Sequence, residues 1–87
     1  MSLNWEQHTS AKFEQLIAKI PVFLRDMAKQ KVSKKAERLA LEAGRAQVIE
    51  KDLVDAFFAE TPFGFHGPMK SDMLSCGIDY RMYGHDV

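Results

Sequence analysis

Residues Pro21–Gly44, PVFLRDMAKQKVSKKAERLALEAG, decide the fold of this 87-residue chain. Apolar side chains recur along the stretch at spacings of three and four, the repeat of one α-helical face. Proline is tolerated in the first turn of a helix, and glycine often follows the last turn in a left-handed conformation. The stretch predicts a helix from Pro21 to Ala43, about 34 Å long at about 1.5 Å per residue. Its apolar stripe comprises Leu24, Met27, Ala28, Val32, Ala36, Leu39, Ala40 and Ala43.

The segment before this helix has the same repeat. Its apolar positions are Phe13, Leu16, Ile17 and Ile20. Thr9 or Ser10 can cap the N-terminus of a helix with a side-chain oxygen. Because Pro21 disfavours a helical conformation at the residue before it, we expect the first helix to run from Ser10 to Ile20.

Shorter elements follow the long helix. The β-branched pair Val48–Ile49 predicts a brief extended segment, and Lys51–Ala59 has the pattern of a third helix. Thr61–Pro68 contains two glycines and two prolines, which is typical of a loop. Pro68–Ser75 is expected to form a short fourth helix, and Ile78–Gly84 one further turn.

Together these elements predict an all-α fold with a short helix, a long central helix, a third helix and a short helical C-terminal tail. Residues 1–61 are expected to form the helical core domain. Residues 62–87 are expected to form a Gly/Pro loop and a tail that packs on it. Strand is expected at Val48–Ile49 at most. The residues expected in the core are Leu24, Ala28, Val32, Leu39, Leu53 and Phe57, together with Phe58, Phe63, Phe65, Met69 and Met73.

Charge is balanced overall but unevenly distributed. The chain has 12 basic and 12 acidic residues, yet the stretch from Arg25 to Arg45 has seven basic residues and three acidic ones. Such a helix suits an acidic partner or a phosphate backbone, although surface helices also carry lysine simply because it favours helix and solubility. The candidate contacts to a partner or nucleic acid are Arg25, Lys29, Lys34, Lys35, Arg38 and Arg45.

Motifs for catalysis or metal binding are missing from the sequence. The single cysteine excludes an internal disulfide, and the spacings among His66, Cys76 and His85 match no zinc signature. We therefore expect no catalytic residue, no metal and no cofactor. No apolar run approaches the roughly 20 residues of a membrane span, and no secretory signal begins the chain, so a cytoplasmic location is expected.

A set of positions resembles a known helical domain. It is the small C-terminal domain of the B subunit of light-independent protochlorophyllide reductase, and it also occurs as a short free-standing protein. The similarity covers roughly Trp5 to Phe58, about 60% of the chain, although the interval from Arg25 to Glu37 is longer here by about one helical turn. The matching positions are Trp5, Ala11, Leu16, Ile20–Arg25, Glu37, Ala40, Gly44, Val48–Ile49, Asp52 and Ala56.

This resemblance links the chain to an oxidoreductase without giving it the reaction. The parent complex is nitrogenase-like and reduces a ring double bond of protochlorophyllide. Its cluster ligands and most of its substrate cavity lie in large domains that this sequence lacks, so no catalytic residue can be carried over. What the resemblance implies is a helical module that packs against, or caps, a larger partner.

A second resemblance is to the histone fold. A short helix, a long helix and the segment Gly44–Leu53 leading into a third helix share its order of elements. In that fold an arginine of the last loop lies near the phosphates of DNA, a role that would fall to Arg45. Histone-like domains are also obligate dimers.

These features predict a non-catalytic interaction module that acts with a partner protein or as a homodimer. Two alternatives stay open, namely a histone-like DNA-binding dimer and an accessory protein for a tetrapyrrole, which the aromatic C-terminal third would suit. If the aromatic tail packs on the long helix of its own chain the protein is a monomer, and if it packs on a second copy the protein is a dimer. The homodimer is favoured, because a tail this aromatic would expose a large apolar patch if it were left loose.

Overall fold

Helix α2 (Val22–Glu42) runs the full length of the molecule. At about 1.5 Å per residue its 21 residues span about 31 Å, and the longest dimension of the protein is 31 Å. Gly44, at a φ of 77°, ends the helix with hydrogen bonds from its own N–H to Leu41 O and from Arg45 N–H to Ala40 O. The predicted long helix is therefore confirmed to within one residue at each end.

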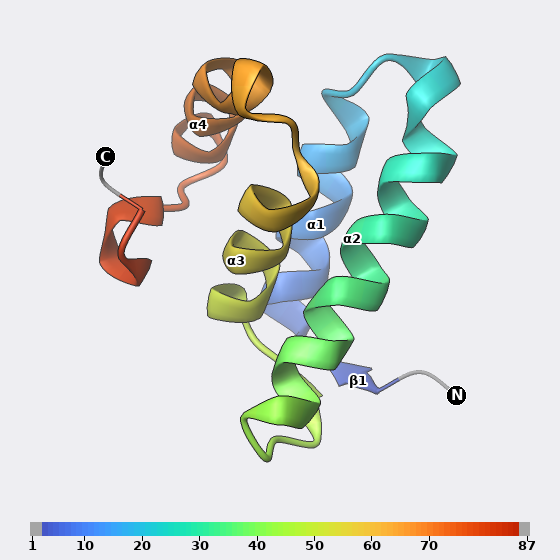
Figure 1. The fold of residues 1–87 in the computed structure, drawn as a ribbon, viewed down its shortest axis with the longest axis vertical. Coiled ribbons are helices and arrows are strands. Elements are labelled where there is room, and N and C mark those ends of the chain that lie inside the picture. The colour runs from blue at the N-terminus through green and yellow to red at the C-terminus, as the bar shows by residue number, and fades with distance from the viewer. Residues whose placement is uncertain (1–2, 86–87) are drawn as a thin grey trace.

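The computed structural model describes residues 3–85 and is all-α, with very little strand. Helices α1 (Gln7–Ala18) and α3 (Glu50–Glu60) lie beside α2, as Figure 1 shows. Helix α3 packs most extensively on α2. The buried residues of α2 are Val32, Ala36 and Ala40, spaced by four, and their small side chains let α3 approach closely.

A two-residue strand pair joins the beginning of the chain to the α2–α3 connection. Strand β1 (Asn4–Trp5) pairs in parallel with β2 (Gln47–Val48), and Glu6 N–H donates to Val48 O at 3.0 Å. The predicted strand thus begins one residue earlier than expected. The expectation of no strand outside Val48–Ile49 was wrong. Strand β1 forms by parallel pairing with a segment that is distant in sequence, and such pairing produces no local sequence pattern.

Helix α1 also begins earlier than the sequence indicated. It starts at Gln7, and Thr9 is fully buried within it, where its hydroxyl donates to Glu6 Oε1 at 2.6 Å. The predicted cap at Thr9 or Ser10 is therefore wrong. The hydrogen bond from Glu6 to β2 fixes the chain just before α1, so the helix can begin there.

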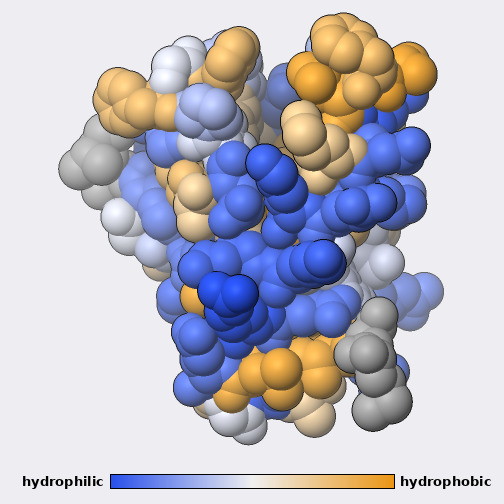
Figure 2. All heavy atoms as spheres, turned by 45° about the vertical axis from the view of Figure 1, so that its right-hand side comes forward, coloured by the Kyte–Doolittle hydropathy of each residue, from blue (hydrophilic) through white to orange (hydrophobic). Residues whose placement is uncertain are grey.

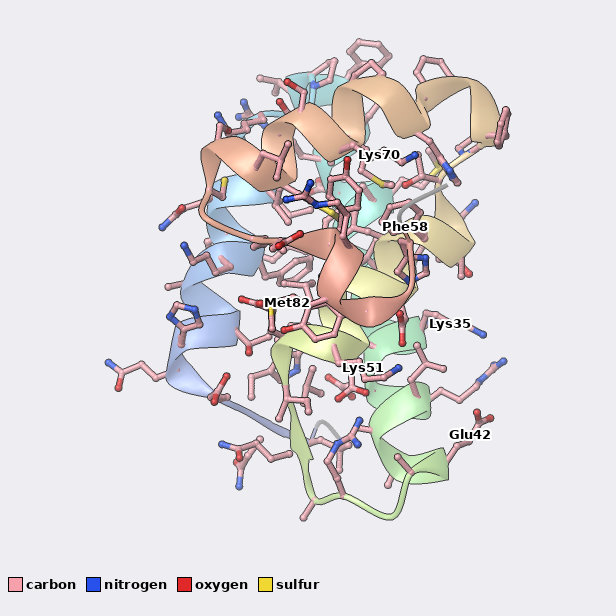
Figure 3. The ribbon with its side chains drawn as sticks, turned by 90° about the vertical axis from the view of Figure 1, so that its left-hand side faces the viewer. Lys35, Glu42, Lys51, Phe58, Lys70 and Met82 are labelled. Carbon is pink, nitrogen blue, oxygen red and sulfur yellow. The ribbon has the colours of Figure 1, made fainter. Side chains whose placement is uncertain are left out.

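The C-terminal part contains more helix than predicted. A 3-10 turn, η1 (Phe63–Phe65), leads directly into α4 (His66–Ser75), which crosses the upper end of the bundle (Figures 1 and 3). The expected loop is therefore wrong in its second half. After α4 comes a second 3-10 turn, η2 (Tyr80–Tyr83), which confirms the predicted last turn.

The tail packs on α3 of its own chain. Tyr83 donates its hydroxyl to Glu50 Oε2 at 2.7 Å, and His85 Nε2 lies 2.6 Å from Asp55 Oδ1. The His85 ring also stacks on Phe58 with ring centres 4.1 Å apart, and Figure 3 shows Phe58 between α3 and the tail. Residues 1–2 and 86–87, the outer ends of the two predicted segments, lie outside the described residues.

The predicted core is correct in part. Val32, Leu53 and Phe57 are buried, as are Met69 and Met73. Leu24, Ala28, Leu39 and Phe58 are only partly buried, and Phe63 and Phe65 are 87% and 64% exposed. The prediction fails for Leu24 and Ala28 because the first half of α2 is not covered along its whole inner face. Within residues 3–85, every helix falls short of the length and apolarity that a bilayer span requires.

Candidate functional site

Three of the predicted contact residues have partners within the protein. Arg25 donates from Nε to Ile20 O at 2.7 Å and from Nη2 to Ala18 O at 2.8 Å, so it satisfies carbonyls at the end of α1. Lys29 lies 3.4 Å from Glu14 in an exposed ion pair. These contacts hold the start of α2 against α1, which gives Arg25 a structural role.

Arg45 forms the most deeply buried ion pair described. Its guanidinium donates to Asp52, a residue only 2% exposed. Asp52 also accepts from Ile49 N–H at 3.0 Å and so satisfies a free amide at the start of α3. The predicted nucleic-acid contact is thus engaged in joining the α2–α3 connection to α3.

The remaining predicted contacts lie on the outer surface of α2. Lys34 and Arg38 are exposed, Lys35 is partly buried, and none of the three makes an ion pair within residues 3–85. Figure 3 shows Lys35 and Glu42 projecting from the same side of α2. With Lys31 these residues form a basic stripe, Lys31, Lys34, Lys35 and Arg38, spaced as one helical face.

The other chemistry-bearing side chains are engaged within the fold. The rings of His66 and His85 both pack on Phe58, and His8 lies 3.5 Å from Glu50, which also accepts from the Tyr83 hydroxyl. His66 Nε2 lies 2.9 Å from Thr61 O, His85 is paired with Asp55, and Cys76 is buried as a free thiol. Among residues 3–85 there is no group of three or more His, Cys, Asp or Glu side chains that could hold a metal ion.

An apolar groove opens at the upper end of the molecule. It lies between the first half of α2 and the α3–α4 connection and has a volume of about 550 Å³. Figure 2 shows two apolar patches at this end, with a hollow between them. The floor of the groove consists of core residues, Leu16, Val32, Phe57 and Met69.

The two sides of the groove carry exposed apolar side chains. Met27, 52% exposed, lines the α2 side, and Phe65 lines the opposite side. Phe23, one turn before Met27 on α2, is 85% exposed and belongs to the same end of the molecule. The sequence pattern predicted Phe65 in the core. Phe65 lies between Gly64 and the start of α4, so it does not belong to a continuous helical face that packs on the core. This position in the sequence was the indication that Phe65 would be exposed.

Four charged side chains line the groove. They are Lys19 of the α1–α2 connection, Lys31 of α2, Glu60 of α3 and Asp72 of α4. None of these four side chains makes an ion pair within the described part of the chain. The groove thus has an apolar floor and charged side chains of both signs around it.

Comparison with known proteins identifies a family. No curated protein and no solved structure matches the chain, and the resemblances to protochlorophyllide reductase and to histones stay predictions. One family model, described as "Protein of unknown function (DUF2621)", matches residues 2–87. Because this match covers nearly the whole sequence, the chain belongs to the DUF2621 family.

Proposed function

We propose that this protein is a non-catalytic interaction module whose docking surface is the groove between α2 and the α3–α4 connection. The observation that carries the proposal is a groove whose floor consists of core residues and whose sides carry exposed apolar side chains such as Met27 and Phe65. Apolar surface of this kind on a small protein is typical of a binding site, because covering it removes apolar area from water.

The shape of the groove suits a protein partner. Apolar grooves between helices accept the apolar side chains of another helix or a second domain, and charges at the sides orient the partner. The resemblance to the protochlorophyllide reductase domain supports the same role, since it implies a helical module that packs against a larger surface. Neither argument requires a reaction at the groove.

Site-specific photo-crosslinking in cells that make the protein tests the proposal. A photoreactive residue replaces Met27 or Phe65 at the groove. The matched control replaces Leu41, which is 60% exposed at the other end of α2. We expect the two groove positions to form the same protein adduct and the Leu41 position to form none. Equal labelling from all three positions would contradict the proposal.

A second candidate function is nucleic-acid binding through the basic stripe. Lys34 and Arg38 are exposed and without ion pairs in the described residues, so they are available to phosphates. Lys34→Glu with Arg38→Glu should abolish a retarded DNA band if the stripe binds phosphates, and moderate salt should do the same. Arg45→Ala is the poorer variant for this assay, because it also strands the buried Asp52 carboxylate. A band that the double substitution leaves unchanged argues against this candidate.

A further inference from the structure

We propose that the groove binds one face of an amphipathic α-helix that belongs to another protein and lies along the first half of α2. This inference rests on the proposed docking role of the groove and names the class of its partner. It follows from four features of the described residues: an apolar row along α2, the shorter length of α3, the volume of the groove, and the charges around it.

The apolar row consists of positions spaced by four along α2. Its members are Leu24, Ala28, Val32, Ala36 and Ala40. The last three are buried, and the small side chains of the two alanines among them let α3 approach closely. Leu24 and Ala28 are only partly buried and line the groove. The groove thus continues the interface between α2 and α3, and Ala28 places another small side chain where a second helix could approach.

Helix α3 covers only part of this row. At about 1.5 Å per residue, the 11 residues of α3 extend about 16 Å, whereas the 21 residues of α2 extend about 31 Å. Figure 1 shows the first turns of α2 rising above the end of α3. Glu60, the last residue of α3, lines the groove together with Lys31 in the middle of α2. The groove therefore begins where α3 ends and follows the part of α2 that α3 leaves uncovered.

The volume of the groove favours a helix with a single apolar face. The part of α2 that lines it from Leu24 to Lys31 is about 10 Å long, which is about two helical turns. A helix with its side chains is about 10 Å wide, so two turns of it would fill about 850 Å³. The groove has a volume of about 550 Å³. It can therefore receive the side chains of one face, while the opposite face stays in water and has to be polar.

The charges around the groove suit the border of such a helix. Lys19, Lys31, Glu60 and Asp72 line the groove and make no ion pairs within residues 3–85. A helix whose polar border carries both acidic and basic residues can pair with all four. Nucleic acid, in contrast, would meet the two carboxylates with like charge. The groove therefore favours a protein helix over a polyanion.

Selection from two displayed peptide pools against the full chain tests the helical class of the partner. Both pools contain peptides of about 14 residues with the same composition. One pool has its large apolar residues at spacings of three and four, and the other has them at every second position. We expect enrichment of the helical pool, and the enriched peptides should gain helical circular dichroism when they bind. Enrichment of the alternating pool, or of neither pool, overturns the inference.

Matched substitutions test the site. Ala28→Gln places a longer, uncharged side chain where the helix would approach, and Ala43→Gln makes the same change at the other end of α2, outside the groove lining. By fluorescence anisotropy, the enriched peptides should bind Ala28→Gln about tenfold or more weakly than the original chain. They should bind Ala43→Gln and the original chain equally.

Circular dichroism checks that each variant is folded. Met27→Gln, at a groove position that is 52% exposed, is a second groove variant and should weaken binding in the same direction as Ala28→Gln. Unchanged binding to both folded groove variants overturns the inference.

Photo-crosslinking of an enriched peptide tests how it lies. A photoreactive residue replaces Leu24 in one variant and Lys31 in another, two groove positions about 10 Å apart along α2. In a helix beside α2, the two cross-linked peptide residues should be about seven positions apart at about 1.5 Å per residue. An extended peptide, at about 3.3 Å per residue, would give a separation of about three positions. A separation of three overturns the inference.

Sedimentation equilibrium of the chain alone tests a second copy as the occupant. We expect the groove to be free in the isolated chain. A dimer that is dissociated by Ala28→Gln and not by Ala43→Gln overturns the inference, because a second copy then occupies the groove.

The two proposals fail separately. If Met27 and Phe65 cross-link to a protein in cells and the helical pool is not enriched, the helical partner is wrong and the docking role stands. If neither position cross-links to any protein, the docking role itself is wrong.

Discussion

The two ends of α2 differ in how its apolar face is closed. At the C-terminal end, which we term the closed end, β1 pairs with β2, Arg45 is bonded to the buried Asp52, and Trp5 donates from Nε1 to Glu37 Oε2 at 3.1 Å. The Trp5 ring also stacks on Phe13. At the N-terminal end, the open end, core residues form the floor of a groove and Phe23 faces solvent.

This difference shows where the stability of the fold is concentrated and where its surface is available. The strand pair and the Trp5–Glu37 hydrogen bond of the closed end join segments that are far apart in sequence, and loss of the Arg45–Asp52 pair would leave a buried carboxylate without its cation. At the open end the exposed apolar groups contribute little to folding, because they remain in water. Substitutions should therefore separate into those that lower stability and those that lower binding.

The largest loss of stability is expected from Leu53→Ala in α3. Leu53 is fully buried, and truncation of a buried leucine removes apolar contacts and leaves a cavity. We expect the free energy of unfolding to fall by about 2–5 kcal/mol, measured by urea denaturation. Leu41→Ala, at an exposed position of α2, is the control and should change it by less than about 0.5 kcal/mol. Similar losses in the two variants would show that α3 does not bury this face.

Arg45→Ala removes the buried ion pair of the closed end. It leaves the Asp52 carboxylate, which is 3% exposed in its side chain, without its cation. Breaking a buried pair costs about 3–5 kcal/mol, and because the Arg45 side chain is one-third exposed we expect about 2 kcal/mol here. Arg38→Ala, at an exposed site, is the matched control. Adding Asp52→Asn to Arg45→Ala should not lower stability further, since it removes the stranded charge. A further large loss would argue against this account.

Tyr83→Phe tests how the tail is attached. Burial and the hydrogen bond to Glu50 raise the pKa of Tyr83 from 10.0 to about 12. Because the folded protein holds this proton more tightly than the unfolded chain, the stabilisation is complete below pH 10 and is lost as the pH rises through 12. Tyr83→Phe should lower the free energy of unfolding by about 1 kcal/mol at neutral pH. Between pH 10 and pH 12 the free energy of unfolding of this variant should fall less than that of the original chain, because the variant has no hydroxyl to ionise at this position.

Urea denaturation at a series of pH values measures this effect. Tyr80→Phe is the matched control, because the Tyr80 hydroxyl has no hydrogen bond within the described residues. The control should lose stability with pH in parallel with the original chain. If the stability of Tyr83→Phe falls with pH as much as that of the original chain, the Tyr83–Glu50 hydrogen bond does not hold the tail.

The smallest effect on stability is expected at the open end. Phe23→Ser replaces a side chain that is 85% exposed, so the free energy of unfolding of the dilute monomer should change by less than about 0.5 kcal/mol. A loss of stability comparable to that of Leu53→Ala would mean that Phe23 belongs to the core and not to an interface.

The sequence by itself determined the helices that carry local signals. Pro21 and Gly44 restrict the backbone at their own positions, so the ends of α2 could be read within one residue. The apolar repeat likewise placed Leu53 and Phe57 on the buried face of α3. Charge patterning identified the basic residues of α2, although it could not separate Arg25 and Arg45, which have internal partners, from Lys34 and Arg38.

Only the tertiary structure decided the strand pair and the groove. The pairing of Trp5 with Val48 joins residues more than forty positions apart, and neither residue signals its partner. The groove exists because the α3–α4 connection lies away from the first half of α2, which leaves Leu24 only partly buried and Met27 exposed although they continue the buried stripe. Helical periodicity fixes which face of α2 is apolar, but packing with distant segments decides how much of that face is covered.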